Sequence, residues 1–209
     1  MLTEVNDVGE CINENKQAEL VELVSNLSKT SDVMIISGSL PQGVESDYYT
    51  KLFSVAAPQT LKIADTEGAK LLAALKTGLD LVKPNKDELQ NTLQQEFKTR
   101  EDLLKGCYSL LDKGAKRVLL SLGKRGAIIT DGTKNYYCKS INVAINSTLG
   151  AGDGMVAAAA MRMEQGAPLD EILRAGVAAG TATVTTFGQI SFTKEKFDEI
   201  YANIKVEEF

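Results

Sequence analysis

The chain has 209 residues, of which 44% are hydrophobic and 24% are charged. This length suits one α/β-sized domain with a single substantial core better than it suits two domains. Acidic residues outnumber basic ones by 28 to 23, giving a net charge of −5, and the two signs are interspersed along the chain. This charge distribution gives no indication of a nucleic-acid surface.

The first half of the chain alternates between helical and strand patterns. Helical spacing of apolar residues predicts helices near residues 20–27, 47–55 and 67–75. Short apolar runs predict strands at residues 33–36, 61–64 and 79–82. Because strands alternate with helices, we expect a mostly parallel sheet that is covered by helices on both faces.

The second half adds a hairpin and three helices to this pattern. Thr99 and Asp102 form a capping-box pattern that predicts a helix from about residue 100, and a strand follows at 117–121. Segments 127–130 and 134–138 predict a hairpin at the antiparallel edge of the sheet. Two further helices are expected from Gly152 and Leu169. We find no repeat or linker, so residues 1–209 are expected to form a single domain.

The residue types that are absent or isolated exclude several kinds of catalytic and metal site. Histidine does not occur, which excludes Ser-His and Cys-His catalysis and removes the usual zinc ligand. The sequence has no apolar run of membrane-spanning length and no signal-peptide pattern, so we expect a cytoplasmic protein without a membrane partner. Cys11, Cys107 and Cys138 lie far apart, and we interpret all three as structural.

A small, glycine-rich turn, Ser147-Thr148-Leu149-Gly150-Ala151-Gly152-Asp153-Gly154, runs directly into a predicted helix. Its bare backbone amides would lie at the positive end of that helix, where anions bind. The usual P-loop and dinucleotide patterns are absent, so a nucleotide site here would be of another kind. On spacing alone, Asp153 is equally well explained as a carboxylate that interacts with the helix dipole.

Three other segments follow predicted strands, at the end of the sheet where α/β proteins bind ligands. The first, Lys83-Pro84-Asn85-Lys86-Asp87-Glu88-Leu89, could also be a plain turn in which Asn85 and Glu88 cap the next helix. The second, Ser121-Leu122-Gly123-Lys124-Arg125-Gly126, also suits an ordinary hairpin. The third, Ser37-Gly38-Ser39-Leu40-Pro41-Gln42-Gly43, could be a simple turn.

In chain order these segments resemble the motifs of the ribokinase-like (PfkB) carbohydrate kinases, namely G-S-L-P-x-G, K-P-N-x-x-E, S-x-G-x-x-G and T-x-G-A-G-D. Thr3-Glu4-Val5-Asn6 with Gly9 further resembles a segment of the 1-phosphofructokinase and tagatose-6-phosphate kinase branch. The resemblance covers essentially the whole chain. It implies the ribokinase-like three-layer sandwich, with a mostly parallel sheet flanked by helices.

The resemblance also implies a role for each motif. Asp153 would be the catalytic base and contact the sugar hydroxyl, while Gly150, Ala151 and Gly152 would cradle the phosphoryl group. Ser39 would contact the phosphate of the substrate. Asn85 and Glu88 would help to organise Mg²⁺ with its waters, and these residue types suit that ion. The residues implied for ATP are Lys83, Asn85, Ser121, Gly123, Gly126 and Thr148.

The implied activity is phosphorylation of a ketohexose phosphate by Mg·ATP, first of all fructose 1-phosphate to fructose 1,6-bisphosphate, with tagatose 6-phosphate as the alternative. Members of the family normally carry further N-terminal strands and a β lid, which we expect this chain to lack. We therefore expect weak or no turnover from it, and a homodimer in the full-length enzyme. A non-catalytic nucleotide-binding fragment stays open as a second class. A dinucleotide-dependent oxidoreductase is disfavoured by the absent G-x-G-x-x-G.

Overall fold

The computed structural model describes residues 9–186 and 192–209. In its first half, the elements are α1 (Glu14–Ser28), β1 (Val33–Ser37), α2 (Tyr48–Ser54), β2 (Leu61–Asp65), α3 (Gly68–Leu75), β3 (Leu81–Val82), α4 (Lys86–Leu93), α5 (Arg100–Asp112) and β4 (Val118–Ser121). They are followed by the short 3₁₀ helix η1 (Gly123–Arg125), β5 (Ala127–Thr130), β6 (Asn135–Cys138), α6 (Ala151–Glu164), α7 (Leu169–Thr183), α8 (Lys194–Asn203) and β7 (Val206–Glu208). Every helix and strand predicted from the sequence is present, with boundaries that differ by a few residues.

The strands form one seven-stranded sheet in which their spatial order follows the chain, from β1 to β7. Strands β1 to β4 are parallel, and each pairing from β4 to β7 is antiparallel. The predicted hairpin is confirmed as the pair β5 and β6. Its expected place at the edge of the sheet is wrong, because β7 pairs with the outer side of β6.

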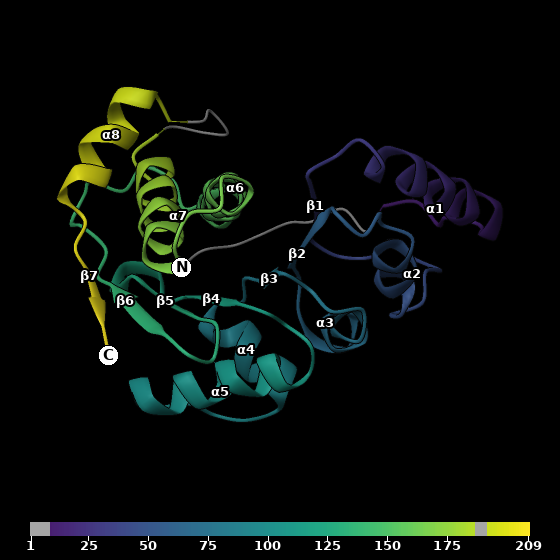
Figure 1. Cartoon of the computed structure of the whole chain (residues 1–209), viewed down its shortest axis with the longest axis horizontal. Coiled ribbons are helices and arrows are strands. Elements are labelled where there is room, and N and C mark those ends of the chain that lie inside the picture. Colours follow the sequence, from purple (N-terminus) through teal and green to yellow (C-terminus); the bar gives the residue numbers. More distant parts are fainter. Residues whose placement is uncertain (1–8, 187–191) are drawn as a thin grey trace.

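Side chains of the strands alternate between two hydrophobic cores, as the two-residue period of a strand requires. Those facing α2, α3, α4 and α5 include Ala64, Val82, Val118, Leu120 and Ile128. Those facing α6, α7 and α8 include Ile63, Leu81, Leu119, Ala127 and Ile129. Figure 1 shows α6, α7 and α8 on one face of the sheet and α3, α4 and α5 on the other. The predicted helical cover on both faces is confirmed.

Helices α6 and α7 approach each other closely because small residues line their contact. A Cβ atom added at Gly180 would lie 3.1 Å from the carbonyl oxygen of Ala151, and one added at Gly176 would lie 3.2 Å from Cγ of Met155. Any larger side chain at these positions would push the helices apart. This contact sets the position of the first turn of α6, where the glycine-rich motif lies.

Two of the three cysteines fit a structural role. Cys107 and Cys138 are buried, and burial raises the pKa of each thiol to about 12. Cys11 is exposed, so burial gives no support to the structural role predicted for it. The Thr3-to-Asn6 part of the branch motif lies outside the described residues. Among the residues that the structure describes, none of the helices is long and apolar enough to span a membrane.

Candidate active site

The candidate segments gather at the carboxyl ends of the parallel strands. The segment with Ser39 follows β1, Lys83 follows β3, and Ser121 is the last residue of β4. Because β1 to β4 are parallel, their carboxyl ends lie along one edge of the sheet. The loops after β3 and β4 are joined there, since the Ser121 amide donates to the Pro84 carbonyl at 2.9 Å.

The glycine-rich turn presents unpaired amides at the start of α6. Gly150 precedes the helix with φ 76°, a left-handed conformation that favours glycine. Within the described parts of the chain, the amides of Gly152 and Asp153 donate to no acceptor, whereas the Gly154 amide bonds to the Gly150 carbonyl at 2.9 Å. Free amides at the positive end of a helix form an anion-binding site. The turn therefore has the geometry that the sequence predicted.

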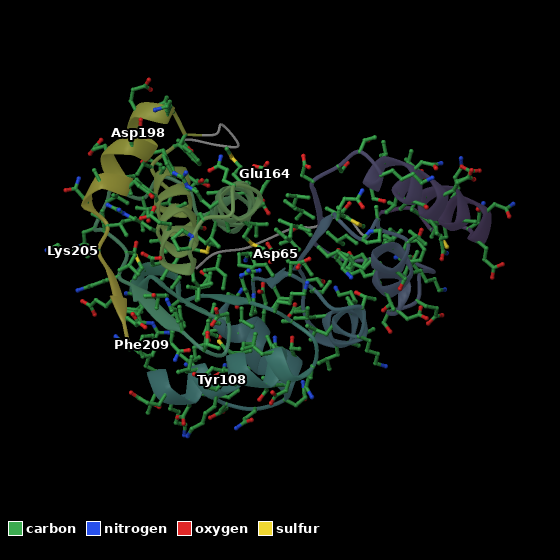
Figure 2. All side chains as sticks on the ribbon, in the orientation of Figure 1. Asp65, Tyr108, Glu164, Asp198, Lys205 and Phe209 are labelled. Carbon is green, nitrogen blue, oxygen red and sulfur yellow. The ribbon has the colours of Figure 1, made fainter. Side chains whose placement is uncertain are left out.

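A buried ion pair lies beside this turn. Nζ of Lys83 is 3.0 Å from Oδ1 of Asp65, and the two side chains are only 5% and 12% exposed. A Cβ atom added at Gly152 would lie 3.3 Å from that same Nζ, so the ammonium group is in contact with the turn. Figure 2 shows Asp65 near the middle of the molecule, where β2 ends.

The charges of this cluster act on one another. Burial raises the pKa of the Asp65 carboxyl, the ammonium of Lys83 opposes that rise by its charge and its hydrogen bond, and the nearby Asp153 adds to it. Asp153 itself is exposed, in the first turn of α6. Asp153 is thus close to both the free amides and the ion pair. Sequence reasoning missed Asp65, although an acidic residue that ends a buried strand is a signal that could have found it.

Asn85 and Glu88 form the capping box that the sequence allowed. Oδ1 of Asn85 accepts from the Glu88 amide at 2.9 Å, and Oε2 of Glu88 accepts from the Asn85 amide at 2.7 Å. Burial raises the pKa of Glu88, while the Asn85 hydrogen bond and the charge of Lys83 oppose that rise. These bonds hold the Glu88 carboxylate still, and its Oε1 makes no hydrogen bond to any described residue.

The residue types around Glu88 suit a magnesium ion that is held mainly by its ligand and by water. No group of three His, Cys, Asp or Glu side chains in the described ranges is arranged to hold a metal. Mg²⁺ commonly binds through one or two carboxylates together with substrate phosphates and retained waters. Oε1 of Glu88 is the atom available for such a bond, because the oxygen of Asn85 already accepts within the cap.

A pocket with a volume of about 200 Å³ brings six of the predicted residues together. They are Ser121, Gly123, Gly126, Thr148, Ala151 and Gly152. Apolar side chains, among them Ile141, Met155 and Val177, supply most of the remaining wall. A flat aromatic base with a phosphate tail needs such a combination of apolar walls and free amides.

A neighbouring cavity of about 590 Å³ shares Ile141, Asn142 and Val143 with this pocket. The larger cavity extends to Lys196 and Glu199 on α8. Neither residue was singled out from the sequence, and no motif there would have indicated them.

Ser39 does not line the pocket with the six residues. It borders a separate cavity of about 620 Å³ together with Cys11 and Pro41. Its loop is nevertheless attached to the end of β2, because the Gly38 amide donates to the Asp65 carbonyl at 3.0 Å. Ser39 therefore lies on the Asp65 side of the ion pair, apart from the pocket near Ser121.

A three-layer α/β sandwich with free amides and a lysine at the carboxyl ends of its parallel strands is the architecture of a phosphate-binding protein. Residues 2–196 match the model of the pfkB family carbohydrate kinases, and the chain belongs to that family. The family resemblance of the motifs is thus confirmed.

Two relatives and one solved structure illustrate the match. The ATP-dependent 6-phosphofructokinase isozyme 2 of Escherichia coli is 36% identical over 93% of this chain and 63% of its own length. The 1-phosphofructokinase of Borreliella burgdorferi is 31% identical over 99% of this chain and 66% of its own length. The structure of phosphofructokinase-2 from Escherichia coli in complex with potassium superposes with a TM-score of 0.85, at 37% identity, over 92% of this chain and 63% of that one. This chain therefore spans 63–66% of the length of these proteins.

Proposed function

We propose that this chain carries the nucleotide-binding and phosphoryl-transfer part of an ATP-dependent kinase that acts on a ketohexose phosphate. Fructose 1-phosphate is the first substrate, and tagatose 6-phosphate is the alternative. The name of the Escherichia coli relative adds fructose 6-phosphate to the sugars that need testing. The observation that carries the proposal is the pair of free amides at Gly152 and Asp153, with Lys83 and Asp65 beside them.

Each group of the site has a part in this reaction. Phosphoryl transfer depends mainly on alignment of the reacting oxygens and on neutralisation of charge. The free amides of Gly152 and Asp153 and the ammonium of Lys83 would stabilise the charge on the transferred phosphoryl group, whereas the Ala151 amide already donates to the Thr148 carbonyl. Asp153 would orient the sugar hydroxyl and accept its proton as the new O–P bond forms and the bond to ADP breaks.

The nucleotide would occupy the pocket lined by Ser121, Gly123, Gly126 and Thr148, with its phosphates directed toward Gly152 and Lys83. When bound, Mg²⁺ would supply positive charge that offsets the negative charge of the phosphates. Glu88 would hold that ion through Oε1 or through water, and Asn85 would keep Glu88 in place. Ser39, in its separate cavity, would receive the phosphate of the sugar.

A non-catalytic nucleotide-binding module is the second candidate. It is favoured by one observation, that neither Asp153 nor Ser39 lines the pocket that gathers most of the residues implied for ATP. This candidate predicts binding of ATP and ADP without transfer to any sugar.

Binding and transfer are therefore measured separately. Calorimetric titration with Mg·ATP tests the pocket, and ADP release tests turnover on fructose 1-phosphate, tagatose 6-phosphate and fructose 6-phosphate. Asp153→Asn is expected to lower kcat by about a thousandfold or more with little change in nucleotide affinity. Asp170→Asn is the matched control, because Asp170 is also acidic and lies in the first turn of a helix, α7.

The outcomes separate the candidates. Turnover on one of the sugars that is lost in Asp153→Asn and kept in Asp170→Asn supports the kinase and identifies its substrate. Nucleotide binding without turnover on any sugar supports the binding module. Near-normal turnover of Asp153→Asn contradicts its role as base, and absence of nucleotide binding contradicts both candidates.

A further inference from the structure

Asp65 and Lys83 lie at matching ends of two neighbouring strands. Asp65 is the last residue of β2, and Lys83 directly follows β3. The two strands are parallel, and Ala64 pairs with Val82. The residues that follow, Asp65 and Lys83, are therefore also neighbours across the two strands. Their side chains form an ion pair of 3.0 Å that is almost completely shielded from solvent.

The same ammonium group is in contact with the start of α6. A Cβ atom added at Gly152 would lie 3.3 Å from Nζ of Lys83. The charge of Asp153, one residue further along, reaches Asp65. Lys83 therefore lies between a carboxylate that can restrain it and the free amides of the glycine-rich turn.

A buried ion pair is weak evidence for a stabilising role, because desolvation of the two charges offsets their attraction. A lysine ammonium is a mobile point charge on a four-carbon stem, so it has a defined position only where another group restrains it. We infer that Asp65 is a positioning residue, which holds Nζ of Lys83 against the Gly150–Gly152 turn before any anion arrives. Charge that is in place in advance needs no reorganisation during the reaction. The inference rests on the proposed function for the identity of the anion, the terminal phosphate of ATP.

The chain contains a second ion pair that serves as a matched control. Nζ of Lys116 lies 2.8 Å from Oδ1 of Asp80, and Asp80 directly precedes β3, at the end opposite to Lys83. The Asp80 side chain is 9% exposed, like that of Asp65, but that of Lys116 is 66% exposed. Asp80→Asn therefore removes a buried carboxylate of the same kind at the other end of β3 from Lys83.

Lysine acetylation of the folded chain tests the position of Lys83 without any ligand. Acetic anhydride labelling, quantified by mass spectrometry, should modify Lys83 about tenfold more slowly than Lys116, because buried groups react only after local opening. Asp65→Asn should raise the rate at Lys83 by about tenfold, while Asp65→Glu, which keeps the charge, retains most of the protection. Asp80→Asn should leave the rate at Lys83 unchanged, and the unfolding temperature of each variant shows that it is folded. Equal rates at Lys83 and Lys116 in the unaltered chain, or no change in Asp65→Asn, overturn the inference.

A double-mutant cycle then tests whether the position serves the nucleotide. Calorimetric titration gives the ratio of Mg·ATP to Mg·ADP affinity, and Asp65→Asn should lower this ratio by about tenfold when Lys83 is present. In the Lys83→Met background the same change should alter the ratio by less than about twofold, because the residue through which Asp65 acts is gone. Independent effects of the two substitutions overturn the inference and leave the proposed function standing. Absence of nucleotide binding by the unaltered chain overturns both.

Discussion

Among the glycines that line the candidate nucleotide pocket, Gly126 is the one where an added methyl group should lower the free energy of unfolding most. Its backbone has φ 95° and ψ −140°, a region that is populated almost only by glycine. A Cβ atom there would lie 1.8 Å from the carbonyl oxygen of Cys138. That carbonyl belongs to the end of β6, where Cys138 pairs with Ala127, so it cannot move without disturbing the hairpin.

The expected cost of Gly126→Ala follows from these two effects. The backbone conformation alone costs an alanine about 1–3 kcal/mol. Relief of the overlap with a paired strand adds about 1–3 kcal/mol, as for other overpacked sites. We therefore expect a loss of about 2–6 kcal/mol, a large share of the roughly 5–15 kcal/mol that stabilises a typical domain.

Urea denaturation followed by circular dichroism measures this loss, with Gly123→Ala as the control. Gly123 also has a positive φ, of 58°, but a Cβ atom there meets nothing within 4 Å. The control carries only the conformational cost of about 1–2 kcal/mol. If Gly126→Ala proves as stable as Gly123→Ala, the close approach of the Cys138 carbonyl does not constrain this loop and the reasoning is refuted.

Three further predictions concern parts of the chain away from the pocket. Thr99→Ala should lower the free energy of unfolding by about 1 kcal/mol, since its hydroxyl caps α5; an unchanged urea midpoint would contradict this. Burial acts to raise the pKa of Asp131, but hydrogen bonds from its turn outweigh it and lower that pKa overall. The ionised Asp131 carboxylate therefore stabilises the folded state above pH 3.8, and this contribution is lost as the pH falls. Urea denaturation at several pH values should show that the free energy of unfolding of the wild type falls in acid relative to that of Asp131→Asn. In the native protein, iodoacetamide should modify the exposed Cys11 and spare the buried Cys107 and Cys138, whose thiol pKa values are raised to about 12; mass spectrometry of the native chain checks this, and labelling at Cys107 would disprove it.

The starts of α4 and α5 are fixed by local caps that the sequence pattern contained. Thr99 and Asp102 satisfy each other's backbone amides across three residues, and so do Asn85 and Glu88. Such contacts need no tertiary structure, which is why the sequence pattern was sufficient. The same locality explains why the glycine-rich turn was found at the start of α6.

The elements that were missed depend on distant partners. Strand β7, Val206–Glu208, has two glutamates among its three residues and shows no apolar alternation. It is a strand because it pairs with β6, and that pairing is what removed the predicted hairpin from the edge of the sheet. Helix α8 likewise gains its buried side, at Ile200, from packing onto the core beside α6 and α7.

By itself, the sequence determined the family, the alternation of strands and helices and the short motifs. Each of these is recognised from patterns of residues that lie a few positions apart in the chain. Only the tertiary structure decided that Lys83 forms an ion pair with Asp65. It also decided that Ser39 borders a different cavity from the pocket lined by Ser121 and Gly152. The reason is physical. The ion pair exists because β2 and β3 align Ala64 with Val82, and it meets the glycine-rich turn because glycines let α6 pack closely on α7. Both depend on contacts between segments that are far apart in the chain.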